Sequence, residues 1–373
     1  MDQGTDLTII PVRPSGEIFH QDGFCLLSRT VAIPLWGWRV LVAAVFWLLK
    51  SPLKVFKLLF LVLAKGTISS RLKNFLVFPK GLFVASVVLQ RRADHIHAHW
   101  ATTPATCAMM ASFLTGVQWS FTAHRWDLVN NNLLAEKVNR CSFVRVISQW
   151  GFKQIIRIAD VATTAKVALI PMGVIPSEAF SFRSLAGRPV LAAVGSLTPI
   201  KGHRFLLEAC KLLVDQGIDF QCLIIGDGPE RLALSRMIQE FDMDHAVTLA
   251  GTWPHHEVLC LLQSGGVHIL VHPSIEAPGG GFEGVPVAVM EAMAHGIPVI
   301  VTNTGSLSDL VDGQTGTVIP PEDPVSLALA VKRLLDNPRL AGELAEAAYH
   351  RVCAEFSLKR SVSALLQWVN HVQ

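Results

Sequence analysis

From Arg188 onward, short apolar runs alternate with amphipathic segments, and this alternation constrains the fold more than any other feature of the chain. Val190–Val194 and Gln221–Ile225 predict buried strands, and the segment 203–216 between them places its apolar residues on one helical face. Further apolar runs follow at 247–250, 267–271, 298–302 and 316–319. Continuous apolar strands joined by helices favour a parallel sheet covered on both faces, which is the doubly wound α/β class.

The chain is also too long for one compact core, since it has 373 residues. The part before residue 187 alternates strand-like and helical segments less regularly. We therefore predict two Rossmann-like domains that face a cleft, at 1–180 and 187–352, with a linker at 181–188. The apolar spacing near the end predicts an amphipathic helix within 353–373 that crosses back to the first domain.

Charge is distributed unevenly although the net charge is only +3. No acidic residue lies between Asp22 and Asp94, whereas the basic apolar segment 29–92 carries eleven positive charges. These charges are Arg29, Arg39, Lys50, Lys54, Lys57, Lys65, Arg71, Lys73, Lys80, Arg91 and Arg92. Basic and apolar residues together favour an anionic lipid surface over nucleic acid, because long aliphatic runs add little to phosphate or base contacts.

The apolar run Val31–Leu49 raises the question of a transmembrane helix. Pro34 and Arg39 interrupt it and Pro52 follows it, whereas a spanning helix needs about 20 apolar residues. Two other interpretations stay open: an amphipathic helix pair on the bilayer surface, or buried core helices with basic outer faces. We expect a cytoplasmic protein that is peripheral on the inner face of the plasma membrane.

The seven cysteines are odd in number, scattered, and without a Cys-x-x-Cys pair. This pattern indicates neither a disulfide framework nor a zinc site and is typical of a reducing compartment. We expect no metal and no cofactor.

The segment 283–300 carries the most specific chemical signal. Glu283 lies in a glycine-rich turn that includes Gly284, and Val285 and Pro286 lead into a predicted helix with Glu291 about one turn inside it. Free amides at the start of a helix form an anion site. The two acceptor oxygens of Glu291 suit the diol of a ribose, and Glu283 is suited to accept hydrogen bonds from another polyol.

At this point the sequence resembles the family-4 retaining glycosyltransferases, which have the GT-B fold. Their Glu-x7-Glu signature corresponds to Glu283 and Glu291, and further motifs occur in the family's order over roughly residues 94 to 370. These motifs are Ile-His-Ala-His-Trp at 96–100, Phe-Thr-Ala-His-Arg-Trp-Asp at 121–127, Pro-Met-Gly-Val at 171–174, Lys-Gly-His at 201–203, Ile-Gly-Asp-Gly-Pro at 225–229 and His-Pro-Ser at 272–274. The pattern is most similar to bacterial exopolysaccharide transferases of the colanic-acid type.

The resemblance implies roles for particular residues. Glu291 would hold the ribose, Glu283 the sugar hydroxyls and Lys201 the diphosphate leaving group, where a cation stabilises developing charge. His124 would meet the donor sugar from the first domain. With Glu291, the residues Gly284, Val285, Pro286, Ser196 and Gly226 form the predicted donor-binding set. The implied partners are a UDP- or GDP-linked sugar, a glycan or lipid-linked acceptor, and a membrane surface, with no nucleic acid.

The sequence departs from the family pattern in two places that bear on the site. Ser196 stands where the family usually has an arginine that partners the lysine. The opening strand and glycine-rich phosphate loop of the first domain are missing from their expected position, and Asp6–Pro14 is predicted to be the family's second strand.

The resemblance implies a hexosyltransferase that retains anomeric configuration, needs no metal and acts in exopolysaccharide or other cell-surface glycan synthesis. Two alternatives remain open at this stage. One is a sugar-nucleotide epimerase or phosphorylase, which shares the fold. The other is a catalytically impaired membrane-associated binding protein, suggested by Ser196 and the missing loop.

Overall fold

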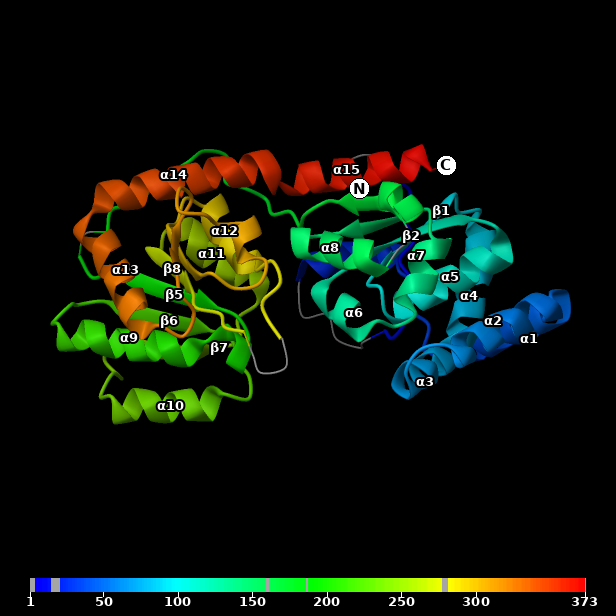
Figure 1. The fold of residues 1–373 in the computed structure, drawn as a ribbon, viewed down its shortest axis with the longest axis horizontal. Helices are drawn as coiled ribbons and strands as arrows, with labels where there is room; N and C mark the ends of the chain where they lie inside the picture. The colour runs from blue at the N-terminus through cyan, green and yellow to red at the C-terminus, as the bar shows by residue number, and fades with distance from the viewer. Residues whose placement is uncertain (1–3, 15–20, 159–160, 186, 277–280, 373) are drawn as a thin grey trace. The chain divides into compact units, whose positions relative to one another are not determined.

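The structure is a computed structural model that describes residues 4–14, 21–158, 161–185, 187–276 and 281–372. It divides into two compact units, one formed by Met1–Ile170 with Ser363–Gln373 and the other by Pro171–Val362. Each unit contains one parallel β-sheet with helices packed against it (Figure 1). The predicted α/β class is confirmed, and each unit is described by itself below.

The second unit has a six-stranded parallel sheet in the order β10-β9-β8-β5-β6-β7. Its strands are β5 (Val190–Val194), β6 (Gln221–Ile225), β7 (Val247–Gly251), β8 (Ile269–His272), β9 (Val299–Thr302) and β10 (Thr317–Ile319). Its helices are α9 (His203–Asp215), α10 (Arg231–Glu240), α11 (His255–Ser264), α12 (Val287–Ala294), α13 (Pro324–Asp336) and α14 (Pro338–Glu355). The strand order reverses between β5 and β8, which makes the sheet doubly wound as predicted.

Two hydrophobic cores cover the two faces of this sheet. Leu191 and Ala193 of β5 belong to a core that α9, α10 and α13 complete, whereas Ala192 between them belongs to a core with α11 and α12. Successive side chains of a strand point to opposite faces, so an unbroken apolar strand fills both cores at once. Figure 1 shows α9 and α10 on one side of the sheet and α11, α12 and α14 on the other.

The first unit has a four-stranded parallel sheet in the order β1-β2-β3-β4, and its strands are β1 (His95–His99), β2 (Gln118–Ala123), β3 (Phe143–Val146) and β4 (Val167–Leu169). Its helices are α1 (Trp38–Lys50), α2 (Pro52–Ala64), α3 (Ile68–Leu76), α4 (Phe78–Arg91), α5 (Thr103–Thr115), α6 (Arg125–Asn130), α7 (Leu134–Arg140), α8 (Gln149–Ile158) and part of α15 (Leu358–His371). The described strands of this sheet lie side by side in chain order, whereas the strand order of the six-stranded sheet reverses between β5 and β8.

The prediction of a strand at Asp6–Pro14 is wrong. Within this segment Ile9 makes only an isolated bridge to Thr30, and the segment pairs with no strand of the four-stranded sheet. The next residue, Ile10, instead contacts the helices before β1, because it packs with Val31 and Ile33 against Val40 of α1.

The boundaries between the units differ from the predicted ones because backbone hydrogen bonds tie the connecting segments to the second unit. Ser177 donates from its backbone nitrogen to Ala294 O at 3.1 Å, so residues from 171 onward belong to the second unit rather than to the first. Near the chain end, Leu358 donates to Val174 O at 2.7 Å, which keeps the start of α15 in that unit. The rest of α15 packs Leu365 and Trp368 against Phe143 in the first unit.

The apolar run Val31–Leu49 does not form one long helix, because residues 31–37 lie outside the helices and only 38–49 belong to α1. Among the described residues no single helix has the length and apolarity to cross a membrane, and one pair, α3 with α4, passes that test together with a bend of 46° between its helices. α4 is largely buried against α5, since most of its apolar side chains belong to the core.

None of the seven cysteines forms a disulfide bond. In the described part of the chain, no group of three or more His, Cys, Asp or Glu side chains is placed to hold a metal ion.

Candidate functional site: a carboxylate–lysine cluster at the strand ends of the second unit

The predicted donor-site residues follow three strands of the second unit at the edge where those strands end. Lys201 closes a short 3-10 turn after β5, Gly226 directly follows β6, and Glu283 lies in the loop after β8. Since all the strands are parallel, their carboxyl ends meet at one edge of the sheet. Open α/β sheets bind their ligands at this edge.

Two glycines let the loops at this edge approach closely. A Cβ atom at Gly226 would lie 1.9 Å from Gly195 O, and one at Gly202 would lie 2.0 Å from Pro273 O. Gly202 also has φ +64°, in the left-handed region that favours glycine. The loops after β5, β6 and β8 therefore touch backbone to backbone. The structure gives Gly226 a packing role, and its role in donor binding stays a prediction.

Lys201 and Glu283 form an ion pair at this edge. Lys201 Nζ lies 2.7 Å from Glu283 Oε2, and both side chains are mostly buried, with exposed fractions of 18% and 15%. His272, at the end of β8, is buried beside the pair, with Nε2 3.7 Å from the same carboxylate oxygen. Burial by itself would raise the pKa of Glu283, but His272 and Lys201 outweigh it and lower the pKa to about 2.

This lowered pKa predicts an acid-dependent contribution to stability. An ionised Glu283 stabilises the fold fully above pH 4.5, its ordinary pKa, and the contribution is lost as the pH falls towards 2. We expect Glu283→Gln to lower the free energy of unfolding at pH 7 by on the order of 2–3 kcal/mol, and the difference from the native chain to shrink between pH 4.5 and pH 3. Urea unfolding followed by circular dichroism at pH 7, 4.5 and 3 measures this.

Glu240→Gln is the matched control for that measurement, because Glu240 is an exposed residue at the end of α10. The control should differ little from the native chain at every pH. A difference for Glu283→Gln that stays constant from pH 7 to pH 3 would contradict the ion pair.

The start of α12 offers free backbone amides next to this pair. Pro286 is the N-cap of α12 and no side chain among the described residues caps the helix. Val285 packs against the core beneath the sheet, and the space beside Gly284 is open within 4 Å. Val285 therefore anchors this turn, and the space beside Gly284 is open to a ligand. The free amides at the start of the helix indicate an anion site there. Gly279 and Gly280 of the predicted glycine-rich turn lie outside the described residues.

Glu291 lies on α12 and is only 6% exposed. His255, at the start of α11, places Nε2 2.6 Å from Glu291 Oε1, and this hydrogen bond fixes the orientation of the carboxylate. Burial raises the pKa of Glu291, and the interaction with His255 opposes that effect. Among the described residues Oε2 has no hydrogen-bond partner, so one acceptor oxygen remains for a ligand hydroxyl.

Ser196 lies two residues after β5 and is exposed. Its Oγ lies 3.4 Å from Thr198 Oγ1, at the limit of a hydrogen bond. The residue lies on the same loop as Lys201, as predicted. Its short side chain leaves Lys201 as the cation of this loop between β5 and α9.

In the first unit, His124 directly follows β2, as predicted, and it is the N-cap of α6. Its backbone nitrogen donates to Asp127 Oδ2 at 2.9 Å, and its ring stacks on Trp100 with centroids 4.3 Å apart. Its Nε2 is buried without a hydrogen-bond partner in the described residues, and burial lowers the pKa of His124 to about 4. A neutral imidazole with one unsatisfied nitrogen at a strand end is suited to meet a ligand hydroxyl.

Three residues of these sites had no predicted role. His272 and His255 pair with the two glutamates, and Trp100, which stacks on His124, has φ 135°, an unusual backbone conformation for a bulky residue. His272 and Trp100 lie inside motifs that the sequence analysis noted, whereas His255 lies 36 residues before its partner and has no sequence signal.

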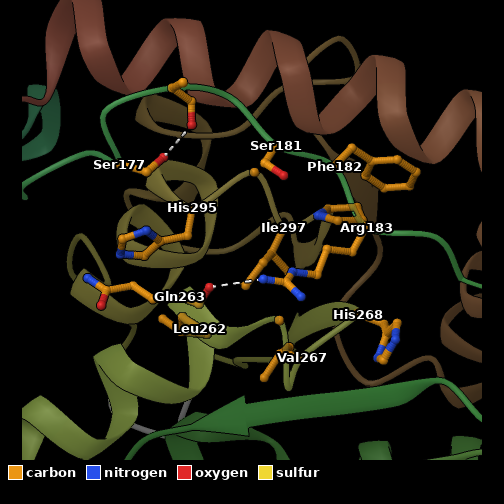
Figure 2. Close-up of a pocket in the computed structure, with 14 residues that line it drawn as sticks. Ser177, Ser181, Phe182, Arg183, Leu262, Gln263, Val267, His268, His295 and Ile297 are labelled. Atoms are coloured by element: carbon orange, nitrogen blue, oxygen red, sulfur yellow. Dashed lines mark hydrogen bonds between the residues drawn. The ribbon is translucent and has the colours of Figure 1, made fainter.

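A small pocket of about 110 Å³ occurs elsewhere in the second unit, and Figure 2 shows it. Val267 and Ile297 line it just before β8 and β9 begin, and Arg183 reaches in and donates to Gln263 O at 3.3 Å. It therefore lies at the amino-terminal edge of the sheet, opposite to Lys201 and Glu283. We do not assign it to the donor.

Comparison with known proteins shows what the second unit is similar to. Residues 174–351 match the family described as "Glycosyl transferases group 1". The putative colanic acid biosynthesis glycosyltransferase WcaL of Salmonella typhimurium is 35% identical over 213 residues, which cover 55% of this chain and 52% of the relative. The amylovoran biosynthesis glycosyltransferase AmsK of Erwinia amylovora is 32% identical over 195 residues, covering 52% and 47%. The chain spans about half the length of these curated relatives.

Solved structures show the same fold at low identity. A glycosyltransferase from Rickettsia africae aligns with a TM-score of 0.65 and 20% identity, covering 80% of this chain and 82% of that one. The Anabaena protein HepE, solved in complex with UDP and glucose, aligns with a TM-score of 0.64 and 19% identity, covering 78% and 81%. The fold is GT-B. Most of the second unit matches the group 1 glycosyl transferase family, and the predicted resemblance to colanic-acid-type transferases is confirmed.

Proposed function

We propose that the protein is a retaining, metal-independent hexosyltransferase that moves a sugar from a nucleotide-sugar to an acceptor hydroxyl in exopolysaccharide synthesis. The observation that carries the proposal is the Lys201–Glu283 pair, 2.7 Å apart beside the uncapped start of α12. A cation, a carboxylate and free amides at one sheet edge match a diphosphate joined to a sugar. The matches to colanic acid and amylovoran transferases, and to a neighbour solved with UDP and glucose, support it.

In this proposal each residue has one task. The α12 amides and Lys201 hold the diphosphate, and Lys201 neutralises the charge that develops as the bond to the sugar breaks. Glu291, oriented by His255, accepts hydrogen bonds from the ribose, and Glu283 accepts them from the sugar. His124 presents its free Nε2 to a hydroxyl of the transferred sugar. The acceptor hydroxyl gives its proton to the departing phosphate oxygen.

A donor panel tests the proposal. The full chain is heated with UDP, UDP-glucose, UDP-galactose, GDP-mannose and no ligand, with and without EDTA. We expect one nucleotide-sugar to raise the melting temperature, because a ligand at about 100 times its Kd adds about 2.7 kcal/mol to stability. Transfer from that donor should keep the anomeric configuration, as read by NMR of the product, and EDTA should have no effect. Failure of every nucleotide to stabilise the chain would contradict the proposal.

The alternatives are less favoured. An epimerase or phosphorylase would convert or phosphorolyse the donor without an acceptor, and NMR of the product separates these reactions from transfer. A catalytically impaired binding protein would keep its partner binding when Glu283 is replaced by Ala. The matched relatives are named as biosynthetic transferases, which supports transfer over both.

We also propose that the protein works at the inner face of the plasma membrane and binds it through α1, α2 and α3. Buried stripes such as Val55, Leu58 and Val62 attach these helices to the unit, yet many of their outward side chains are apolar too. Outward apolar side chains that are more than 55% exposed are Trp38, Val42, Val45, Leu49, Leu53, Phe56, Phe60, Ile68 and Leu72. With the basic residues between them, these side chains form what we call the basic apolar face, and Figure 1 draws the helices that carry it, α1 to α3, in blue. Such a face suits anionic lipid.

Vesicle binding checks this location. We expect the full chain to sediment with vesicles that contain 30% phosphatidylserine and to bind pure phosphatidylcholine at least tenfold less, with the difference falling at high salt. Leu53→Glu with Phe56→Glu should lower binding to the anionic vesicles at least fivefold. The control Leu329→Glu changes a leucine of α13 in the second unit whose exposure of 59% is close to the 60% of Phe56. Equal binding by both variants would rule out the basic apolar face.

A further inference from the structure

A pocket in the first unit contains none of the residues assigned above to donor binding or transfer. It has a cavity volume of about 470 Å³ and lies between α2 and α5, over Trp119 of β2 and beside the end of α7. This volume is within the range of about 300–1,000 Å³ that is usual for small-molecule sites. The pocket forms entirely from residues of one unit.

The floor of this pocket is hydrocarbon. Leu58, Met109 and Trp119 line it and are each 2% exposed. The single polar atom of Trp119, its indole nitrogen, already donates to Arg140 O at 3.0 Å. Leu61 and Phe113 complete the apolar walls. Ser112 adds one hydroxyl to the lining, so the interior is mostly apolar and suits an apolar chain.

The rim of the pocket is positively charged. Lys57, Lys65 and Arg140 line it, and the carboxylate of Glu136 pairs with both Lys65 and Arg140. Three cations against one carboxylate leave an excess of about two positive charges. Lys57 forms no ion pair with any described residue, so its ammonium is available to an anion. An apolar interior with a cationic rim suits a molecule with a hydrocarbon chain and an anionic head.

The pocket is continuous with the basic apolar face. Phe60, 74% exposed on α2, belongs to both, and Lys57 lies one helical turn before it. A chain held in a bilayer could therefore enter the pocket along α2 without crossing water. A soluble ligand would gain nothing from this continuity.

We propose that this pocket binds the hydrocarbon chain of a lipid-linked acceptor, with the phosphate of that lipid on Lys57 and the neighbouring cations of the rim. The inference rests on the proposed function, because it identifies what carries the acceptor sugar. It adds a site: the first unit would hold the acceptor by its lipid and not only by its sugar.

Isothermal titration of the full chain with farnesyl phosphate below its micelle concentration tests the site. We expect saturable binding, at least tenfold weaker binding of farnesol, and none of inorganic phosphate. Dihexanoyl phosphatidate, a two-chain bilayer-type lipid, should also bind at least tenfold more weakly. Absence of farnesyl phosphate binding would overturn the proposal, and equal binding of the phosphatidate would replace the lipid-linked acceptor by a membrane lipid.

Two pairs of variants locate the binding. Ala64 is an exposed residue of the pocket wall, so Ala64→Trp should block the opening and weaken farnesyl phosphate at least tenfold. Its control, Ala135→Trp, changes an exposed alanine of α7 outside the pocket and should bind within twofold of the native chain. Lys57→Gln should weaken binding three- to tenfold, and Lys54→Gln, on the same helix but outside the pocket, should not.

If a variant in the pocket and its control bound farnesyl phosphate with equal affinity, the placement of the lipid in this pocket would be overturned. The nucleotide-sugar thermal shift of Ala64→Trp separates this inference from the proposed function, since that variant should keep the full shift. If Ala64→Trp loses farnesyl phosphate binding and keeps the thermal shift with the nucleotide-sugar, the lipid site in this pocket is supported. If all variants keep farnesyl phosphate binding, the lipid site is refuted, whatever the thermal shift with the nucleotide-sugar shows.

Discussion

Lys201→Ala is expected to lower kcat for sugar transfer by roughly 10²–10³-fold while the chain stays folded. The ammonium of Lys201 is the cation placed on the loop after β5, and Ser196 supplies no second charge there. Removing one group that stabilises transition-state charge costs about 2.7–4 kcal/mol in other enzymes. Glu283 also loses its ion-pair partner, which should lower stability by about 1–2 kcal/mol.

The measurement is the rate of transfer from the nucleotide-sugar that the donor panel identifies, with UDP affinity measured in parallel by titration. Lys201→Arg should recover part of kcat, because the charge returns with a different shape. Lys211→Ala is the matched control, since Lys211 pairs with Asp215 on the exposed side of α9. If Lys201→Ala turned over at the same rate as Lys211→Ala, the proposed role of Lys201 would be refuted.

Lys137→Met is expected to destabilise the first unit by about 3–5 kcal/mol. Lys137 is fully buried, and its Nζ donates to Ala101 O at 2.7 Å, Thr102 O at 2.8 Å and Asn132 O at 2.7 Å. An ammonium has three donors, so all are used. Methionine keeps most of the side-chain volume but leaves three buried carbonyl groups without a hydrogen-bond donor. Removing one partner of a buried polar interaction lowers the free energy of unfolding by an amount of this size.

Tryptophan fluorescence in urea measures this effect, because eight of the nine tryptophans belong to the first unit and only Trp253 belongs to the second. Lys153→Met is the control, since Lys153 is exposed on α8, and it should change stability by less than about 0.5 kcal/mol. Because Ala101 and Thr102 follow Trp100 directly, the variant should also change the environment of the Trp100–His124 stack. A cost below about 1 kcal/mol would show that the three bonds contribute little.

Much of the second unit could be predicted from the sequence. The strands at Val190–Val194 and Gln221–Ile225 occur where the apolar runs place them. The helix that carries Glu291 begins just after Pro286, as its position predicts. These predictions succeeded because parallel strands and their helices are specified by local apolar periodicity and by residues with restricted backbones. The prediction of a strand at Asp6–Pro14 failed because a local pattern shows only that a segment is compatible with a strand. Whether the segment joins a sheet depends on pairing partners elsewhere in the chain.

The sequence by itself determined the fold class, the carboxylate pair and the lysine, because short-range patterns and spacings encode them. Only the tertiary structure decided that His255 orients Glu291, that His272 lies beside Glu283, and that Lys137 ties three carbonyl groups together. It also decided that α2 and α5 leave a pocket with a charged rim. These features join residues far apart in the chain, and the burial that sets their energies exists only once the elements have packed.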